Sequence, residues 1–189
     1  MLTTTCMMLD SLQKTNNQTR GLNTSTLFKY SAVITYRRNI MGKYYSTKHY
    51  GHNIGLSAVF RQPNADHSHC HLLHGYSLAF TFTFGCNELD NKNWAVDFGG
   101  LKPLKAWLED NFDHKTAIDK DDPFLDKFME LQELGLAEIV VMDGVGAEKF
   151  AEHAFNFADK LIREKSNNRC YCVKTEVAEH GANSAIYEA

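Results

Sequence analysis

The chain from Met41 onward alternates between segments with the period of a β-strand and segments with the period of a helix. The clearest strand pattern is LLHGYSLAFTFTFG, residues 72–85, in which every second position is apolar or aromatic. Successive side chains of a strand point to opposite faces of a sheet, so these alternate positions share one face. That face is predicted to carry His74, Tyr76, Leu78, Phe80, Phe82 and Phe84. The strand is therefore expected to line the core, with His74 where it begins.

Other strands are predicted from aromatic and β-branched content and from alternation. They are KYYSTKHYGHNIGLSAVFRQ, ending near Phe60, then WAVDF (94–98), AEIVVMD (137–143), RCYCVKTEVAE (169–179) and SAIYE (184–188). In the segment 169–179, simple alternation places one set of side chains on a common face: Tyr171, Val173, Thr175, Val177 and Glu179.

Three segments have apolar residues at helical spacing. They are GLKPLKAWLEDNF (100–112), DDPFLDKFMELQELG (121–135) and GAEKFAEHAFNFADKLIREK (146–165). Pro103 fits the first only within its first turn, and Gly135 is a typical residue to end the second. This order of elements predicts an α+β fold, an antiparallel sheet with helices packed on one face. Because the edge strands of such a sheet lack partners, assembly into a homo-oligomer is expected.

Composition narrows the class of protein. The 189 residues suffice for one domain with its own core, and 43% hydrophobic and 23% charged residues are ordinary for a globular protein. A net charge of −3 does not provide the positive surface that binding to nucleic acid requires. The chain has no apolar run near the roughly 18 residues that a membrane span needs. Five cysteines, an odd number, favour free thiols in a reducing cytoplasm over a disulfide framework.

Residues 1–40 differ from the rest in composition. They hold five basic residues against the single acid Asp10, and they are rich in Ser, Thr and Asn. An organelle transit peptide has this composition, but no clear amphipathic helix emerges. A disordered extension, or a start assigned upstream of the true start at Met41, is the favoured interpretation. The domain is accordingly assigned to residues 41–189.

A dense histidine cluster, HSHCHLLHGY at residues 67–76, holds four of the nine histidines and one cysteine. Zinc binds neutral imidazole and thiolate, and a catalytic zinc commonly has three protein ligands. His67, His69 and His71 are two residues apart, the H-x-H spacing of metal ligands on a strand, although they fall in or near a loop. The cluster is thus either a metal site or a solvated polar loop.

Other residues have the chemistry of acid–base catalysis. Cys70 would act as a thiolate if its imidazole neighbours stabilised the charge, and otherwise it is a structural thiol. Asp113 beside His114 can fix the tautomer of an imidazole, although such pairs also occur by chance. Glu179 ends a strand on its apolar side, where it is either exposed or placed to accept hydrogen bonds from a ligand.

Taken in order, CHLLHGY, AVDFGGLKPLK, FDHKT and EVAEHGANSAIYE resemble the motifs of the 6-pyruvoyl-tetrahydropterin synthase and 6-carboxy-5,6,7,8-tetrahydropterin synthase family. The resemblance covers about residues 45–188. It implies the tunnelling fold (T-fold), a four-stranded antiparallel sheet with helices on one face, assembled as trimers stacked into hexamers. It also implies a soluble enzyme that binds 7,8-dihydroneopterin triphosphate at a subunit interface.

The resemblance assigns roles to individual residues. Cys70 would be the thiolate base, and Asp113 and His114 its partner relay. Glu179 would bind the ring nitrogens of the pterin. His74 would be a ligand of the zinc ion, which polarises the side-chain oxygens of the substrate.

The spacing of four residues from Cys70 to His74 is more similar to the carboxy branch of the family. That branch implies 6-carboxy-5,6,7,8-tetrahydropterin as product, with acetaldehyde and triphosphate released, feeding 7-deazaguanine and queuosine synthesis. The alternatives are a 6-pyruvoyl-tetrahydropterin synthase and a non-catalytic pterin-binding relative without zinc.

Two positions depart from the family's zinc-binding pattern. Phe60 stands where the first strand usually ends in a histidine, and Tyr76 stands where H-G-H has its second histidine. Either the metal is lost, or neighbouring loop histidines replace the missing ligands. We predict replacement, with His69 and His71 joining His74 around the zinc ion.

Overall fold

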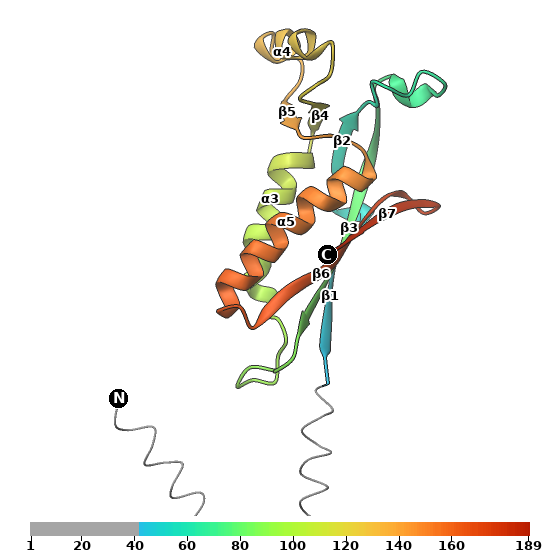
Figure 1. Cartoon of the computed structure of the whole chain (residues 1–189). Coiled ribbons are helices and arrows are strands. Elements are labelled where there is room, and N and C mark those ends of the chain that lie inside the picture. The colour runs from blue at the N-terminus through green and yellow to red at the C-terminus, as the bar shows by residue number, and fades with distance from the viewer. Residues whose placement is uncertain (1–41) are drawn as a thin grey trace, which may run out of the picture. The chain divides into compact units, whose positions relative to one another are not determined.

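The computed structural model describes residues 42–189, so the interpretation of residues 1–40 lies outside the described part of the chain. A long central strand, β3 (His74–Cys86), organises the sheet (Figure 1). β1 (Tyr44–Tyr50) and β2 (Leu56–Phe60) pair antiparallel with successive parts of one edge of β3. β6 (Cys170–His180) pairs antiparallel with the other edge, and β7 (Asn183–Glu188) pairs with β6. With β1 and β2 counted as one interrupted strand, this is the predicted four-stranded antiparallel sheet.

The first strand is not continuous to Phe60 as predicted. A short 3-10 turn, His52–Ile54, separates β1 from β2, and Gly55 follows it with a φ of 85°. Glycine adopts this left-handed conformation without the steric cost that a side chain would bring. The GHNIG segment therefore bends the chain out of the sheet and returns it to the same edge of β3.

Two short strands extend the sheet beyond β2. β4 (Lys115–Asp119) pairs in parallel with β2, and β5 (Ile139–Met142) pairs in parallel with β4. β5 was predicted, whereas β4 was not, because KTAID directly follows a helix and is too short to show alternation.

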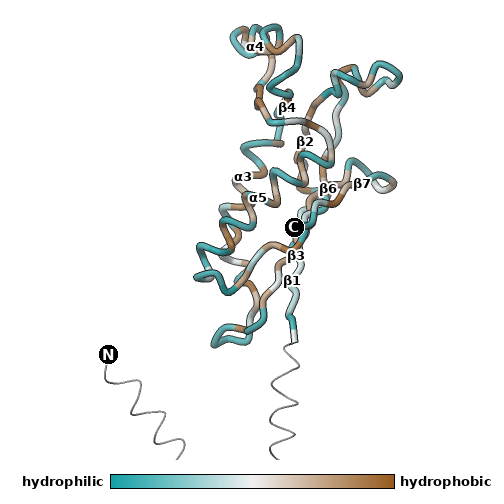
Figure 2. The backbone as a smooth tube through the Cα atoms, in the orientation of Figure 1, coloured by the Kyte–Doolittle hydropathy of each residue, from teal (hydrophilic) through white to brown (hydrophobic). Residues whose placement is uncertain are grey.

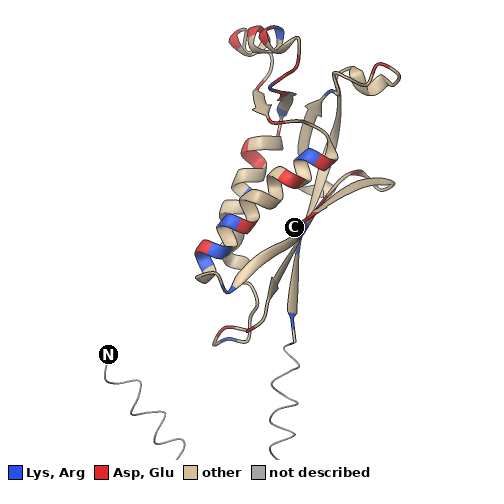
Figure 3. Ribbon diagram, in the orientation of Figure 1, with Lys and Arg blue, Asp and Glu red and all other residues tan. Residues whose placement is uncertain are grey.

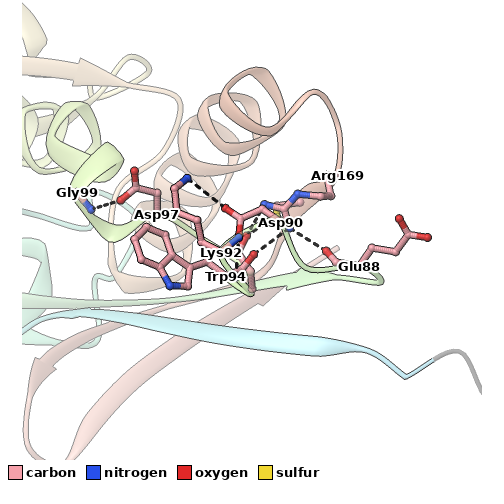
Figure 4. Close-up of polar contacts among 9 residues, drawn as sticks. Glu88, Asp90, Lys92, Trp94, Asp97, Gly99 and Arg169 are labelled. Carbon is pink, nitrogen blue, oxygen red and sulfur yellow. Dashed lines mark hydrogen bonds and ion pairs between the residues drawn. The ribbon is translucent and has the colours of Figure 1, made fainter.

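Residues 94–98, predicted as a strand, form a loop instead. Asp97 Oδ1 accepts a hydrogen bond from the Gly99 amide at 2.9 Å and begins the 3-10 turn Phe98–Leu101. Arg169 holds this loop from the other side, because its guanidinium donates to the carbonyl oxygens of Glu88, Trp94 and Ala95 (Figure 4). Ala95 and Val96 are thus buried by loop packing without a strand partner, whereas Trp94 and Phe98 are 47% and 48% exposed.

The two longer helices, α3 (Lys102–Phe112) and α5 (Ala147–Ser166), lie side by side on one face of the sheet, as predicted (Figure 1). The short α4 (Leu125–Glu133) lies near β4 and β5. Hydrophobic and hydrophilic positions alternate along α3 and α5 (Figure 2), and most charged residues belong to helices and loops (Figure 3). None of the helices in the described chain has the length and apolarity required to span a bilayer.

The core fills the space between the helices and β3. Phe80, Phe82 and Phe84 are fully buried, as the alternation predicts. The Phe80 ring lies 4.9 Å from that of Phe112 on α3, which in turn lies 5.1 Å from Phe150 on α5. Each such side chain contributes about 1.5–3 kcal/mol through its removal from water.

β6 does not follow the simple alternation that its sequence predicts. Thr83 pairs with Lys174 and Phe84 with Cys172, so Val173 is an extra residue in a bulge. A bulge reverses the side of the sheet on which the following residues lie. As a result Cys172 is buried on the side of Val177, and the prediction that Tyr171 and Val173 share that face is wrong.

Candidate functional site

The candidate site lies where β3 begins, next to the end of β2. Phe60 is the register partner of His74, and Tyr76 lies two residues further along the same face of β3. The three rings form a cluster: the ring centroids of Phe60 and His74 are 4.7 Å apart, those of His74 and Tyr76 5.7 Å, and those of Phe60 and Tyr76 6.2 Å. We call these three residues the aromatic triangle.

Gly75 allows the two strands to approach at this point. A Cβ atom on Gly75 would lie 2.8 Å from the carbonyl oxygen of Ala58 and 3.0 Å from Cγ2 of Val59. Because backbone atoms cannot move aside as side chains can, any larger residue would push β2 from β3. Glycine at this position therefore keeps the aromatic triangle together.

Glu179 and Cys70 both lie close enough to Tyr76 to act on it electrostatically. Partial burial first, and then the proximity of Glu179 and of Cys70, raise the pKa of the Tyr76 phenol, which stays protonated at neutral pH. Glu179 is the unpaired residue of a second bulge in β6, because Ala178 pairs with Ser184 and His180 with Asn183. Bulges often redirect a side chain beside a functional site. The structure thus brings Cys70, His74 and Glu179 to the surroundings of one tyrosine.

Cys70 lies in a short 3-10 turn, His69–His71, and is exposed. Its amide donates to Ser68 Oγ at 3.2 Å, and its carbonyl oxygen accepts from the Gln62 amide at 2.8 Å. The Gln62 side chain donates in turn to the carbonyl oxygen of Val145 at 2.7 Å. The loop that carries the thiol is therefore anchored to the end of β2 and to the segment that precedes α5.

Hydrogen bonds to the backbone fix the tautomer of two histidines. His71 Nδ1 lies 2.5 Å from the carbonyl oxygen of Ser68, and His74 Nδ1 lies 2.9 Å from that of Leu72. A carbonyl oxygen only accepts, so Nδ1 carries the hydrogen and Nε2 of each neutral ring keeps its lone pair. Such rings can accept a hydrogen bond or bind a metal ion.

The aromatic triangle does not fit a zinc ion. Phe60 supplies a carbon ring without a donor atom, and it is only 1% exposed. Between residues 42 and 189, no three side chains of His, Cys, Asp or Glu lie near enough to one another to hold a metal. His69 and His71 are thus not gathered with His74 in this chain, and the zinc ligand set remains a prediction.

Asp113 and His114 form a hydrogen-bonded pair at the end of α3. His114 Nδ1 lies 2.6 Å from Asp113 Oδ1, and the His114 side chain is 85% exposed. His114 has a φ of 58°, a left-handed conformation that costs a non-glycine residue about 1 kcal/mol or more. Since the carboxylate accepts from Nδ1, Nε2 of His114 is available as an exposed base.

The pair is separate from the aromatic triangle within one chain. His114 lines a surface depression of about 690 Å³ with residues of α4 and of the 135–140 segment, including Gln132, Leu136 and Glu138. Neither Cys70 nor Glu179 lines this depression. The predicted catalytic residues therefore fall into two groups, one beside Tyr76 and one beyond β2.

The sequence pattern gave no signal for one neighbour of the site. His180 lies with its ring 5.7 Å from that of Tyr76, and it also lines a hollow of about 340 Å³ at the turn between β6 and β7. Only the bulge at Glu179 brings His180 there. A pattern that assumes strict alternation cannot locate such a residue.

Comparison with known proteins gives a consistent result. The sequence model of the 6-pyruvoyl tetrahydropterin synthase family matches residues 43–189. A segment of 62 residues is 36% identical to 6-carboxy-5,6,7,8-tetrahydropterin synthase of Rickettsia typhi and covers 32% of this chain and 45% of that protein. For the protein of the same name from Rickettsia conorii, the identity is 35% over 54 residues, or 28% and 39% of the two chains. The match thus spans less than half the length of these curated relatives.

Two solved structures share the fold. A protein of Wolinella succinogenes superposes with a TM-score of 0.62 at 19% identity, over 78% of this chain and 98% of the other. The 6-pyruvoyltetrahydropterin synthase of Plasmodium vivax superposes with a TM-score of 0.57 at 11% identity, over the same shares of the two chains. These similarities show that the described chain has the T-fold.

Proposed function

Because this chain belongs to the 6-pyruvoyl tetrahydropterin synthase family, we propose that it is a lyase acting on the side chain of 7,8-dihydroneopterin triphosphate. The observation that supports this best is the arrangement around Tyr76. A thiol, an imidazole with a free Nε2 and a carboxylate on a bulge lie around one ring at the open end of the sheet. Such a set can bind a heterocycle through its ring N–H groups and remove a proton from carbon beside it.

The proposed product is 6-carboxy-5,6,7,8-tetrahydropterin, which would enter 7-deazaguanine and queuosine synthesis. The curated relatives carry the name of this activity, and the spacing from Cys70 to His74 agrees with that branch. All four cysteines between residues 42 and 189 are free thiols, which supports the proposed cytoplasmic location.

Each proposed catalytic residue has a task suited to its position. The Glu179 carboxylate accepts hydrogen bonds from the pterin ring and fixes its orientation. The Cys70 thiolate, on the anchored loop, removes a proton from the substrate side chain. His114, oriented by Asp113, relays a proton to or from the reacting atoms.

We further propose that the two groups of residues meet between two copies of the chain. β1 pairs only with β3, and β7 only with β6, among the described residues, so each leaves one edge free to hydrogen-bond. A homo-oligomer joined through these edges would pair the Cys70 group of one copy with the Asp113–His114 pair of another. Trimers stacked into hexamers are the proposed assembly.

A second candidate function is pterin binding without catalysis. The buried Phe60 ring favours it, since a family position for a metal ligand has become part of the core. A zinc site at His74, His69 and His71, as the sequence predicts, would restore the metal and count against this candidate.

The proposal is tested by incubating the purified chain with 7,8-dihydroneopterin triphosphate and identifying the products by mass spectrometry. We expect 6-carboxy-5,6,7,8-tetrahydropterin, acetaldehyde and triphosphate. A 6-pyruvoyl product would assign the chain to the other branch. Tight binding of the pterin without turnover would establish the non-catalytic alternative.

Substitutions at the two key positions sharpen the test. Cys70→Ala should lower kcat at least about 100-fold, because a general base contributes this much or more.

Glu179→Gln should raise the Kd of the pterin about 10–100-fold, measured by calorimetric titration, since it removes charged hydrogen bonds. The matched control is Glu176→Gln, which changes a partly buried glutamate on the same strand and should leave Kd unaltered. Unchanged binding in Glu179→Gln would refute the assigned role.

A further inference from the structure

Phe60 is part of the buried core, and its side chain has no atom that could bind a metal in any rotamer. Its ring is 1% exposed and packs edge-on against Phe150 of α5, with the centroids 5.1 Å apart. The other face of the site presents the His74 ring at 4.7 Å. The triangle would offer a zinc ion only the His74 nitrogen and the Tyr76 phenol oxygen, whereas zinc in proteins takes three or four protein donors.

Unlike Phe60, Tyr76 carries a polar group, its phenol hydroxyl, which makes no contact that the fold requires. Its ring contacts the rings of Phe60, His74 and His180. Within residues 42–189 the Tyr76 hydroxyl makes no hydrogen bond to another protein group. By contrast, the neighbouring His74 Nδ1 is hydrogen-bonded to the carbonyl oxygen of Leu72. The phenol can therefore donate to, and accept from, a bound molecule.

Tyr76 lies beside the residues that the proposed reaction uses. It lies on the face of β3 that carries His74, its ring is 5.7 Å from that of His180, which follows Glu179 in the chain, and Cys70 lies nearby. A pterin held by Glu179, with its side chain toward Cys70, would pass over this ring. The oxygens of that side chain would then lie within reach of the Tyr76 hydroxyl.

We propose that the hydroxyl of Tyr76 takes over the task of a metal ion in this chain, donating a hydrogen bond to the side-chain oxygen of the substrate while Cys70 removes the neighbouring proton. This inference rests on the proposed lyase function. It makes the chain a zinc-independent enzyme in which the aromatic triangle replaces the metal centre. The step forms no covalent bond to Tyr76, and the proton removed from carbon resides on the Cys70 sulfur.

Metal binding is measured first, because it needs no substrate. The purified full chain, dialysed against zinc and analysed by mass spectrometry, should hold far less than one zinc per chain. Cobalt titration should give no absorption of a tetrahedral site. The double variant Phe60→His/Tyr76→His should acquire both signals, because it places three imidazoles at the positions of the triangle. Tyr76→His alone provides two imidazoles and leaves the buried Phe60 unchanged, so it should not disturb the core. It should bind cobalt more weakly than the double variant and more strongly than the natural chain.

The catalytic role of Tyr76 is measured separately. Tyr76→Phe should lower kcat about 100-fold, the usual effect of removing one preorganised donor, with little change in the Kd of the pterin. The matched control is Tyr187→Phe, since Tyr187 on β7 packs against Phe155 of α5, away from the aromatic triangle, and should tolerate the loss of its hydroxyl. Addition of a chelator should leave the rate of the natural chain unchanged.

Several outcomes would overturn the inference. Zinc near one per chain that disappears in His74→Ala would establish the rebuilt metal site with His69 and His71 instead. Full kcat in Tyr76→Phe would remove the hydroxyl from the mechanism. Pterin binding without turnover in the natural chain would refute the catalytic role of Tyr76 together with the proposed function, while the cobalt titration would still decide whether the triangle binds metal.

Discussion

Burial governs the protonation of two side chains in the core. Tyr50 is 4% exposed and Cys172 is 1% exposed. Loss of solvation raises the pKa of each group to about 12, from ordinary values of 10.0 for Tyr50 and 9.0 for Cys172, and Glu109 adds to the effect at Tyr50. Because the folded state holds these protons more tightly than the unfolded state, stability should fall as the pH rises.

The pH window follows from these values. The stabilisation is complete below about pH 9 and is lost progressively as the pH approaches 12. Tyr50→Phe should therefore lose less free energy of unfolding than the natural chain between pH 8 and pH 11, measured by urea melts at each pH. Tyr45→Phe, at a tyrosine that is 56% exposed, should behave as the natural chain does. Equal losses in Tyr50→Phe and the natural chain would contradict the assignment to Tyr50.

Among the site residues, the sequence identified those that belong to motifs. Cys70, His74 and Glu179 were singled out by type and order, and the structure brings them to one tyrosine. His180 was not singled out, because its contact with Tyr76 depends on a bulge. A bulge leaves no mark in hydrophobic periodicity when the residues around it are mixed in polarity.

At the scale of elements, the loop between β3 and α3 depends on a residue distant in sequence. Arg169 donates to carbonyl oxygens of Glu88 and Trp94 at 2.8 and 3.2 Å and to that of Ala95 at 3.0 Å. Figure 4 shows the guanidinium beside Asp90, whose carboxylate accepts from the Lys92 and Trp94 amides. The loop is thus held by its own turn and by one arginine.

Arg169→Ala should lower the free energy of unfolding by about 1–3 kcal/mol, because three backbone carbonyl oxygens lose a charged donor. Hydrogen exchange should also rise in residues 88–97. The control is Arg163→Ala, which breaks an exposed pair with Asp159 four residues earlier on α5 and should cost at most about 0.5 kcal/mol. Equal effects of the two substitutions in chemical denaturation would show that the loop does not rely on Arg169.

At the scale of the whole molecule, the separation of Cys70 from His114 has a testable consequence. If the active site forms between copies, inactive chains carrying Cys70→Ala and His114→Ala should restore activity to one another in mixed oligomers. Random pairing gives each site an intact thiol and an intact imidazole in about a quarter of cases, so about a quarter of the natural activity is expected.

The measurement combines co-expression of two differently tagged chains, tandem purification and native mass spectrometry to confirm mixed oligomers. A mixture of Cys70→Ala and Cys70→Ser serves as the control and should stay inactive. Confirmed mixed oligomers without restored activity would place the complete site within a single chain.

The sequence by itself determined the antiparallel sheet, the helices on one of its faces and the motif residues for which we propose catalytic roles. These properties depend on local periodicity and on short motifs, which neighbouring residues encode. Only the tertiary structure decided the bulges in β6, the parallel pairing of β4 and the closure of Phe60, His74 and Tyr76 into one cluster. Those features depend on which strand lies beside which and on the space left by Gly75, and distant residues fix both.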